Sequence, residues 1–471
     1  MVVDPPASSG NSAPPNPEPL RDYSPAGPWK SGIAQMAQMK QLAKEQRDKQ
    51  RRENQAETRL CNMRSLALFL IPVFLIAHAA QAARLEVGQG KTFDSIEKAV
   101  AAARLGDEVI VFARPGNQPY AKVAVMVRTP NLSIHGSDAS GLVKIDGTGF
   151  DYSGVGAVPR AIFQFDPAAN HCTLEGFDLT GSHNDSCNGA GVRINAANDV
   201  TIRRCVISGN DMGIMSNGQV RDSTGAGQLI EQCLIQKNGN EKRAGYNHNL
   251  YLGGASVTVR GCEIAFSLTG HNLKSRAHLN WIEYNWIHDS ANRELDLVDD
   301  VGNTDIPGSD AVLLGNYIRK APSMAGNKAV IHFGKDGKAD HTGTLWLVHN
   351  TIITPYISPV VDLSAPSAGA VFLNNLIKQN SREKGSLVPL KNGVKETAIR
   401  GEGNTFTGDF ADIPAAVKQG PLIGWDRLGL PWTAFARKPE ALLEYVGDNK
   451  VQPRKDRVPA AGAGTGIFLE K

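Results

Sequence analysis

One pattern of side chains recurs in TLEGFDL (173–179), TIRRCVI (201–207), LIEQCLI (229–235), TVRGCEI (258–264), WIEYNWI (281–287), VLLGNYI (312–318), WLVHNTI (346–352) and VFLNNLI (371–377). Each segment has an apolar residue, then Phe, Cys or Asn three positions later, then Ile or Leu two positions after that. The pattern returns every 23 to 34 residues, which is a typical period for a solenoid whose coils bury their apolar faces against one another. The sequence therefore predicts an all-β solenoid.

The middle position of the pattern predicts a ladder of stacked side chains. Its members, one per coil, are Phe177, Cys205, Cys233, Cys262, Asn285, Asn316, Asn350 and Asn375. Equivalent residues of adjacent coils lie about 4.8 Å apart, so that each Asn amide can bond to the next. We interpret the three Cys as small members of the same stack, because they lack the paired spacing of zinc ligands. Cys172 and Cys187 are off the ladder and are the better disulfide candidates.

At the start of the solenoid, a helical pattern of apolar residues is followed directly by a predicted strand. In FDSIEKAVAAARLGDEVIVF (93–112), Phe93, Ile96, Val100 and Ala103 recur at helical spacing, and residues 108–112 read as a strand. One helix followed only by strands is typical of a helical cap on a solenoid.

These features resemble the right-handed parallel β-helix proteins of the pectate-lyase-like superfamily. The resemblance covers residues 85–400 and includes the opening TFDSIEKAVAAARLGDEVIVFARPG (92–116), VRTPNLSIHGSD (127–138) and VKIDGTG (143–149). It implies a right-handed parallel β-helix over residues 83–400. It also implies an irregular tail over residues 401–471 that packs on the solenoid and contains PLIGWDRLGLPW (421–432).

The first 82 residues read as two segments outside the fold. Residues 1–62 are polar, and we expect them to be disordered or to be an over-extension of the reading frame, with Met63 as the true start. Residues 63–82 have one Arg, a short apolar run and small residues at the end, the layout of a cleaved signal peptide. The run is too short to span a bilayer. We therefore expect a secreted or periplasmic protein with no membrane span after cleavage.

The charge balance limits the partners. The chain has 50 basic and 47 acidic residues, which argues against a nucleic-acid partner held by bulk charge and against a generic membrane-surface binder. We expect a monomer whose partner is a polysaccharide.

A second strand in each coil predicts the functional face. Its segments are GVRIN (191–195), GIMSN (213–217), HNLYLG (248–253), HNLKSRA (271–277), RELDLVD (293–299), AVIHFG (329–334) and VVDLS (360–364). Alternation places their Leu residues inward and one column outward. That column reads Arg193, Met215, Tyr251, Lys274, Asp296, His332 and Asp362.

Several polar residues around this column predict a site for an acidic sugar polymer. Cleavage of a uronate chain by β-elimination needs a cation on the carboxylate, a base for the neighbouring proton and an acid for the leaving oxygen. We expect Arg276 to bind the carboxylate, and Lys274 or Tyr251 to be the base, with the other or His271 as the acid. The residues expected to contact substrate are His248, Asn249, Asn272, Arg293 and His332. The alternative is structural: Asn and His ladders at a corner, with Lys274–Asp296 as a cross-coil ion pair.

The column is similar to the site of polysaccharide lyases of the chondroitinase B and alginate lyase type. That resemblance implies a Lys/Arg pair and a calcium ion, for which Asn249, Glu294 and Asp296 would be the ligands. The match departs in one respect, because Lys274 and Arg276 lie on one strand here and on different coils in that family.

Three other functions stay open. A glycoside hydrolase would use two of Asp296, Asp299 and Asp300 as acid and base, although the GH, DD and NTD fragments occur in the wrong order for a polygalacturonase. A uronate epimerase would begin with the same proton removal as a lyase. A non-catalytic carbohydrate-binding or surface-structural β-helix would use aromatic platforms such as Tyr246, Tyr251, Trp281 and Trp286.

Overall fold

The computed structural model describes residues 82–137, 141–154, 158–423, 443–447 and 450–453, the last two ranges by backbone alone. The predicted segments 1–62 and 63–82 lie outside the described residues, apart from residue 82, as does most of the chain after residue 423. Among the described residues, no helix is long and apolar enough to cross a membrane.

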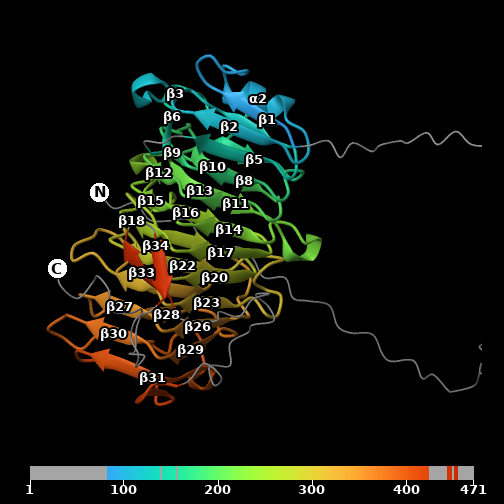
Figure 1. Cartoon of the computed structure of the whole chain (residues 1–471). Coiled ribbons are helices and arrows are strands. Elements are labelled where there is room, and N and C mark those ends of the chain that lie inside the picture. The colour runs from blue at the N-terminus through green and yellow to red at the C-terminus, as the bar shows by residue number, and fades with distance from the viewer. Residues whose placement is uncertain (1–81, 138–140, 155–157, 424–442, 448–449, 454–471) are drawn as a thin grey trace, which may run out of the picture. The chain divides into compact units, whose positions relative to one another are not determined.

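Short parallel strands form three walls, and each wall takes one strand from nearly every coil. The first wall contains β1 (Arg84–Val87), β2 (Glu108–Phe112), β5 (Ser133–Ser137), β8 (Thr173–Glu175), β11 (Thr201–Arg203), β14 (Gln228–Glu231), β17 (Ser256–Arg260), β20 (Leu279–Glu283), β23 (Ala311–Leu314), β26 (Thr344–Val348), β29 (Gly369–Leu373), β31 (Ile399–Thr407) and β32 (Val417–Gln419). Figure 1 shows its successive strands, from β2 to β29, stacked in chain order.

The other two walls are built in the same way. The second wall contains β3 (Tyr120–Ala121), β6 (Val143–Asp146), β9 (Phe177–Thr180), β12 (Val206–Ser208), β15 (Leu234–Gln236), β18 (Glu263–Ala265), β21 (Trp286–His288), β24 (Tyr317–Arg319), β27 (Thr351–Thr354) and β30 (Leu376–Gln379). The third wall contains β4 (Val125–Val127), β7 (Ala161–Phe165), β10 (Ala190–Asn195), β13 (Met212–Asn217), β16 (Leu250–Leu252), β19 (Leu273–Ser275), β22 (Leu295–Val298), β25 (Ile331–Gly334) and β28 (Val361–Leu363). The expected right-handed parallel β-helix is confirmed.

Helical structure is scarce in the described residues. The helix α2 (Ile96–Ala102) lies at the start of the stack, where the sequence predicts the cap, and the Ser95 hydroxyl accepts the Lys98 amide at its first turn. Single 3-10 turns occur at η1 (Pro115–Asn117), η2 (Val220–Asp222), η3 (Glu241–Arg243) and η4 (Glu396–Ala398). An antiparallel hairpin, β33 (Leu443–Gly447) with β34 (Lys450–Pro453), is the only described part of the chain after residue 423.

The bend between the first and second walls is the same in the coils from β8 onward. One residue there has a left-handed backbone, with φ between 50° and 82°, and the ladder residue follows it. These left-handed residues are Gly176, Arg204, Gln232, Gly261, Tyr284, Gly315, His349, Asn374 and Gly403. Residues other than Gly adopt this backbone at a cost of roughly 1 kcal/mol. The ladder that follows therefore has to stabilise each bend.

The predicted ladder forms at these bends. The amide Nδ2 of Asn285 donates to Asn316 Oδ1 at 3.0 Å, and the same bond links Asn316 to Asn350, Asn350 to Asn375, and Asn375 to Asn404. Asn404, the last residue of this ladder, lies in β31, so the stack of side chains continues past residue 400. Beside the ladder, seven Ile residues from Ile207 to Ile377 are fully buried along the second wall.

The cysteine ladder is confirmed and the disulfide prediction is wrong. The Cys233 amide donates to Cys262 Sγ at 3.4 Å, and the Cys262 amide donates to Asn285 Oδ1, so the thiols continue the amide ladder. Cys172 and Cys187 are both free and buried. The Cys172 thiol donates to the Thr129 carbonyl at 3.3 Å instead, in the equivalent turn of the preceding coil.

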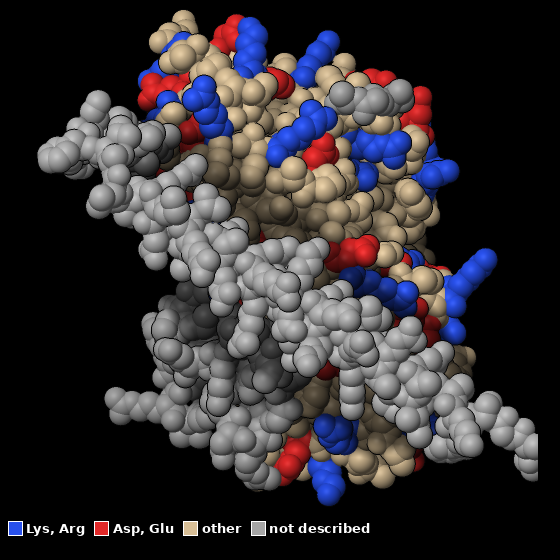
Figure 2. Space-filling model, turned by 90° about the vertical axis from the view of Figure 1, so that its right-hand side faces the viewer, with Lys and Arg blue, Asp and Glu red and all other residues tan. Residues whose placement is uncertain are grey.

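On the outer surface that Figure 2 shows, basic and acidic side chains are interspersed on the described residues.

Replacing Asn350 by Ala should lower the free energy of unfolding by about 3 kcal/mol, because the amide serves partners in both adjacent coils and each buried group left unpaired costs about 1–3 kcal/mol. Asn350 Nδ2 donates to Leu313 O and Asn375 Oδ1, and its Oδ1 accepts from Asn316. Chemical denaturation measures the change. Asn392→Gly is the matched control, since this Asn is exposed and its φ of 54° suits Gly. Equal stability of the two variants would contradict the role of the ladder.

Candidate functional site

The third wall presents the predicted column in the predicted register. Tyr251 pairs with Lys274, Lys274 with Asp296, Asp296 with His332, and His332 with Asp362. The Leu residues on either side of this column are buried in the core, as alternation requires. The strands therefore bring five side chains from five consecutive coils onto one face.

Asp296 is the centre of a charge cluster on this face. Its Oδ2 lies 2.6 Å from Lys274 Nζ and 3.3 Å from His271 Nε2. Its Oδ1 lies 2.8 Å from His332 Nδ1 and 3.1 Å from Arg293 Nη1. The carboxylate is 1% exposed, so that four nitrogen-bearing side chains replace its hydration shell. The predicted cross-coil ion pair is present, and it is part of a larger network.

The pKa values of this cluster follow from burial and charge. Burial by itself would raise the pKa of Asp296, but His271, His332 and Lys274 outweigh it and hold this pKa well below 3.8. For His271, burial is the larger effect and lowers its pKa to about 4, although Asp296 opposes it. Asp296 is thus an anion at pH 7.

A loop after β25 adds a second carboxylate. Asp336 Oδ2 lies 2.6 Å from Lys274 Nζ and 2.8 Å from Arg276 Nη2. Asp299 holds this loop, because its Oδ1 accepts the Gly337 amide at 2.7 Å and its Oδ2 accepts the Ala339 amide at 2.9 Å. Lys274 therefore donates to two carboxylates at once. This removes it as a free base, a role that the sequence assigned to Lys274 or Tyr251.

Arg276 is held in a fixed orientation. Its Nε donates to the Tyr251 hydroxyl oxygen at 3.1 Å, Nη1 donates to the Asp299 carbonyl, and Nη2 reaches Asp336. The guanidinium thus links Tyr251 to the Asp336 loop and has fewer free donors for a substrate carboxylate than we expected.

The two Asn of the repeated HNL motif form a second buried ladder. Asn238 Nδ2 donates to Asn249 Oδ1 at 2.9 Å, Asn249 to Asn272 at 2.8 Å, and Asn272 to Glu294 Oε2 at 2.6 Å. Burial raises the pKa of Glu294 and lowers that of Lys320, whose Nζ lies 3.7 Å away. The structural alternative accounts for Asn249 and Asn272, which face the interior and not a ligand.

The predicted calcium ligands do not fit a cation in this arrangement. Both amide atoms of Asn249 and both carboxylate oxygens of Glu294 are used within the ladder. Asp296 is surrounded by basic groups, whereas calcium needs six to eight oxygen ligands. No group of three or more His, Cys, Asp or Glu in the described part of the chain is placed to hold a metal.

His248 is buried against its equivalent in the next coil. The rings of His248 and His271 stack with centroids 5.0 Å apart, and His248 Nδ1 accepts the His271 amide at 3.0 Å. Burial holds the pKa of His248 well below 6.5. The Tyr251 ring meets the His248 ring edge-on at 5.3 Å. His248 therefore packs against the Tyr251 ring from the buried side, and it is not placed to contact substrate.

A pocket of about 220 Å³ opens beside Tyr251 on the third wall. Arg193, Tyr251, Arg276 and Asp300 line it together with residues of β10, β13 and β16 and of the turns that follow β13 and β16. Burial raises the pKa of Asp300. Arg193 Nη2 donates to the Asn188 carbonyl and the Met215 sulfur, and its buried Nε has no partner among the described residues.

The Arg193 charge has no counterion in the described structure. No described carboxylate lies within 4.0 Å of it. Burial, helped by the nearby Arg160, lowers its pKa to about 10. The sequence places Arg193 in the outward column, but it does not show that this guanidinium lacks a carboxylate partner.

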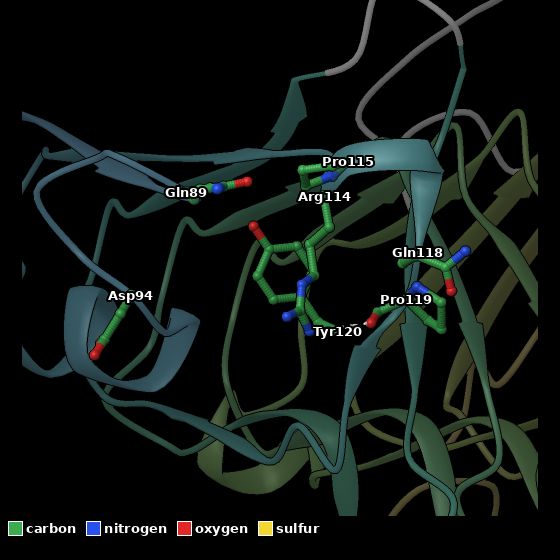
Figure 3. A pocket seen from close by; sticks show the side chains of 8 residues that line it. Gln89, Asp94, Arg114, Pro115, Gln118, Pro119 and Tyr120 are labelled. Carbon is green, nitrogen blue, oxygen red and sulfur yellow. Dashed lines mark hydrogen bonds between the residues drawn. The ribbon is translucent and has the colours of Figure 1, made fainter.

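A larger pocket of about 750 Å³ lies at the first coils, away from the column. Figure 3 shows the Arg114 side chain beside the Tyr120 ring, at 5.6 Å from the ring centroid. The Tyr120 hydroxyl donates to the Phe112 carbonyl at 2.6 Å. These groups stabilise the packing of the cap.

The aromatic platforms expected of a binding protein are only partly available. Trp281 is 1% exposed and belongs to a buried cluster, and Trp286 stacks on His288. Tyr246 is exposed, and Tyr251 faces the pocket.

Asp296→Asn should lower the free energy of unfolding by about 3 kcal/mol, because breaking a buried ion pair leaves uncompensated charges. Asp362→Asn is the matched control. Asp362 is further from its partner, at 3.6 Å from Arg293, and partly exposed, so its loss should cost less than about 1 kcal/mol. Urea denaturation at pH 7 measures both, and an equal loss in the two variants would contradict the central role of Asp296.

Acid should destabilise the protein through its buried neutral imidazoles. Burial lowers the pKa of His341 to about 4, whereas an unfolded His titrates near 6.5. The unfolded chain then binds the extra proton, so this contribution is present above pH 6.5 and is lost as the pH falls towards 4. From pH 7 to pH 5, His341→Gln should lose about 2 kcal/mol less stability than the wild type. The exposed His171→Gln is the control; identical pH profiles of H341Q and wild type would refute the prediction.

Comparisons with known proteins give distant likenesses. No family model matches the chain, and no curated protein matches it. Among solved structures, a pectin methylesterase in complex with a hexasaccharide has a TM-score of 0.33 and 10% identity, covering 77% of this chain and 99% of the other. A tailspike protein of Acinetobacter baumannii bacteriophage Fri1, a capsular polysaccharide depolymerase, has a TM-score of 0.39 and 13% identity, covering 73% and 65%. A pectin methylesterase from Erwinia chrysanthemi has a TM-score of 0.30 and 11% identity, covering 72% and 93%. The three walls of the chain itself show that it is a right-handed parallel β-helix protein.

Proposed function

We propose that the third wall binds an acidic polysaccharide and cleaves it by β-elimination at the pocket beside Tyr251. The observation that carries this proposal is the unpaired, partly buried guanidinium of Arg193. A buried cation without a counterion is unfavourable unless a ligand supplies the anion. A uronate carboxylate matches the planar fork of an Arg.

The position of the pocket suits a polymer. It opens on a wall whose strands come from consecutive coils, so that an extended chain running along the column passes Arg193 before Tyr251. Arg193 and Tyr251 are two coils apart, through Met215. Arg193 would bind the carboxylate of a sugar unit and make the proton on the adjacent carbon more acidic, since it neutralises the charge that forms there.

Tyr251 is the group for proton transfer in this proposal. Its oxygen accepts a hydrogen bond from Arg276 Nε, and a neighbouring guanidinium stabilises negative charge on an oxygen. The phenolate form of Tyr251, stabilised by Arg276, takes up the proton next to the carboxylate, the electron pair of the broken C–H bond forms the new double bond, and the glycosidic bond breaks. Asp300, whose pKa burial raises, lies in the same pocket and can return a proton to the leaving oxygen.

Export from the cytoplasm is part of the proposal. It rests on the predicted signal peptide at residues 63–82, which the structure does not describe. The monomeric state and a calcium requirement also stay predictions.

The test is the ultraviolet absorbance of the unsaturated sugar that β-elimination produces, measured with the full chain and a panel of uronate polymers, with and without calcium. Tyr251→Phe should lower kcat by about 10²- to 10⁴-fold. Arg193→Ala should lower kcat/KM by about 10- to 100-fold through the loss of charged hydrogen bonds. Tyr356→Phe and Arg84→Ala are the matched controls, both outside the pocket.

The other outcomes separate the alternatives. New reducing ends without absorbance would replace the lyase by a glycoside hydrolase. Binding without any product would leave a non-catalytic carbohydrate-binding β-helix. No binding to any polymer would overturn the proposal.

A further inference from the structure

His332 makes a second contact on the side away from Asp296. Its Nδ1 lies 2.8 Å from Asp296 Oδ1, and its Nε2 lies 2.7 Å from Ser364 Oγ. The three residues come from consecutive coils of the third wall: Asp296 from β22, His332 from β25, and Ser364 directly after β28. The imidazole thus bridges a carboxylate and a hydroxyl.

The hydrogen bonds define the direction of proton transfer. The Asp296 carboxylate is an anion and can only accept hydrogen bonds. His332 Nδ1 must therefore carry a hydrogen and donate a hydrogen bond to the carboxylate. In the neutral ring Nε2 is then the acceptor, and the Ser364 hydroxyl donates to it. This is the tautomer that a general base next to a nucleophilic Ser requires.

Solvent exposure increases from Asp296 through His332 to Ser364, as is expected for an orienting acid, a base and a nucleophile. Asp296 is 1% exposed and His332 is 5% exposed, whereas Ser364 is only partly buried. Lys274 and Arg293 fix the carboxylate from other directions. The orienting acid and the base are shielded from water, and the hydroxyl is within reach of a ligand.

The backbone beside Ser364 leaves space and supplies a donor. Gly334 has a φ of 144°, and a Cβ at this position would lie 2.4 Å from Ser364 Oγ. The following amide, Lys335 N–H, donates to Ser364 Oγ at 2.7 Å. A side chain at position 334 would thus collide with the hydroxyl, and the Lys335 amide helps to fix the position of the hydroxyl oxygen.

We propose that Ser364, His332 and Asp296 form a nucleophilic triad that hydrolyses a carboxylic ester. Ser364 Oγ attacks the ester carbonyl carbon while its proton passes to His332 Nε2. His332 returns this proton to the alcohol oxygen as the ester bond breaks, which leaves an acyl-Ser364. A water then attacks the acyl group, gives its proton to His332, and releases a carboxylic acid with the regenerated hydroxyl.

The natural ester is one carried by a polysaccharide, and this part rests on the proposed function of the same wall. Its chemistry is a carboxylic ester, either an O-acyl group on a sugar hydroxyl or a methyl ester of a uronate. The release of a small acid or of methanol from the polymer distinguishes the two.

The experiment uses the full chain and two probes that need no polysaccharide. The wild type should hydrolyse p-nitrophenyl acetate and form a covalent adduct with an alkyl fluorophosphonate at Ser364, located by mass spectrometry of peptides. Ser364→Ala should lower kcat by at least about a thousandfold and abolish the adduct. Ser367→Ala, three residues further and exposed, should behave as wild type.

Two results would overturn the triad: hydrolysis that Ser364→Ala leaves unchanged, or a wild type that is folded by circular dichroism yet neither hydrolyses the ester nor takes the label. His332→Gln, which keeps a polar side chain, should lose labelling as well. These probes contain no uronate, so the two proposals can fail separately. Ester hydrolysis without formation of an unsaturated sugar would support the triad and reject the lyase. Formation of an unsaturated sugar without ester hydrolysis would support the lyase and reject the triad.

Discussion

The structure depends on one repeated interaction: the side-chain amide that follows a left-handed residue at the bend between the first and second walls. The bend is intrinsically unfavourable in the coils where Arg204, Gln232, Tyr284, His349 or Asn374 occupies it. Each Asn amide from Asn285 to Asn375 bonds to the coil before and to the coil after, so that these coils do not adopt the bend independently. This coupling fixes the register of all three walls, and the column on the third wall is a consequence of that register.

The sequence predicts the register well because the coils from residue 173 onward repeat the same pattern of apolar and ladder residues. Asn285, Asn316, Asn350 and Asn375 are identical residues at the same place in each repeat, and Tyr251, Lys274 and Asp296 follow from alternation once the coils are aligned. Both features need only the period of the chain. The outward column is therefore predicted residue by residue, even though the spacing of the ladder residues varies from 23 to 34 along the chain.

The roles of the site residues depend on distances between coils that the pattern does not contain. The HNL repeat looks functional, yet Asn249 and Asn272 turn inward and bond to each other, since a ladder satisfies their amides best. Asp336 lies in a loop outside the aligned segments, and Ser364 is the last residue of the aligned segment VVDLS (360–364) but does not belong to the outward column. Arg193 is visible in the sequence, but the absence of a described counterion is a property of the fold.

The ladders also have a direction. Every amide of the second ladder, from Asn238 to Asn272, donates from Nδ2 to the oxygen of the next member, and the ladder ends on the carboxylate of Glu294. The first ladder points the same way, from Asn285 to Asn404. The aligned amides add up to a dipole along the solenoid, with its positive end towards the later coils, and Glu294 is placed at that end as an acid is placed at the N-terminus of a helix. A solenoid held in this way has an electrical polarity as well as a chain direction, so an inserted coil would be accepted only if its amide faced the same way.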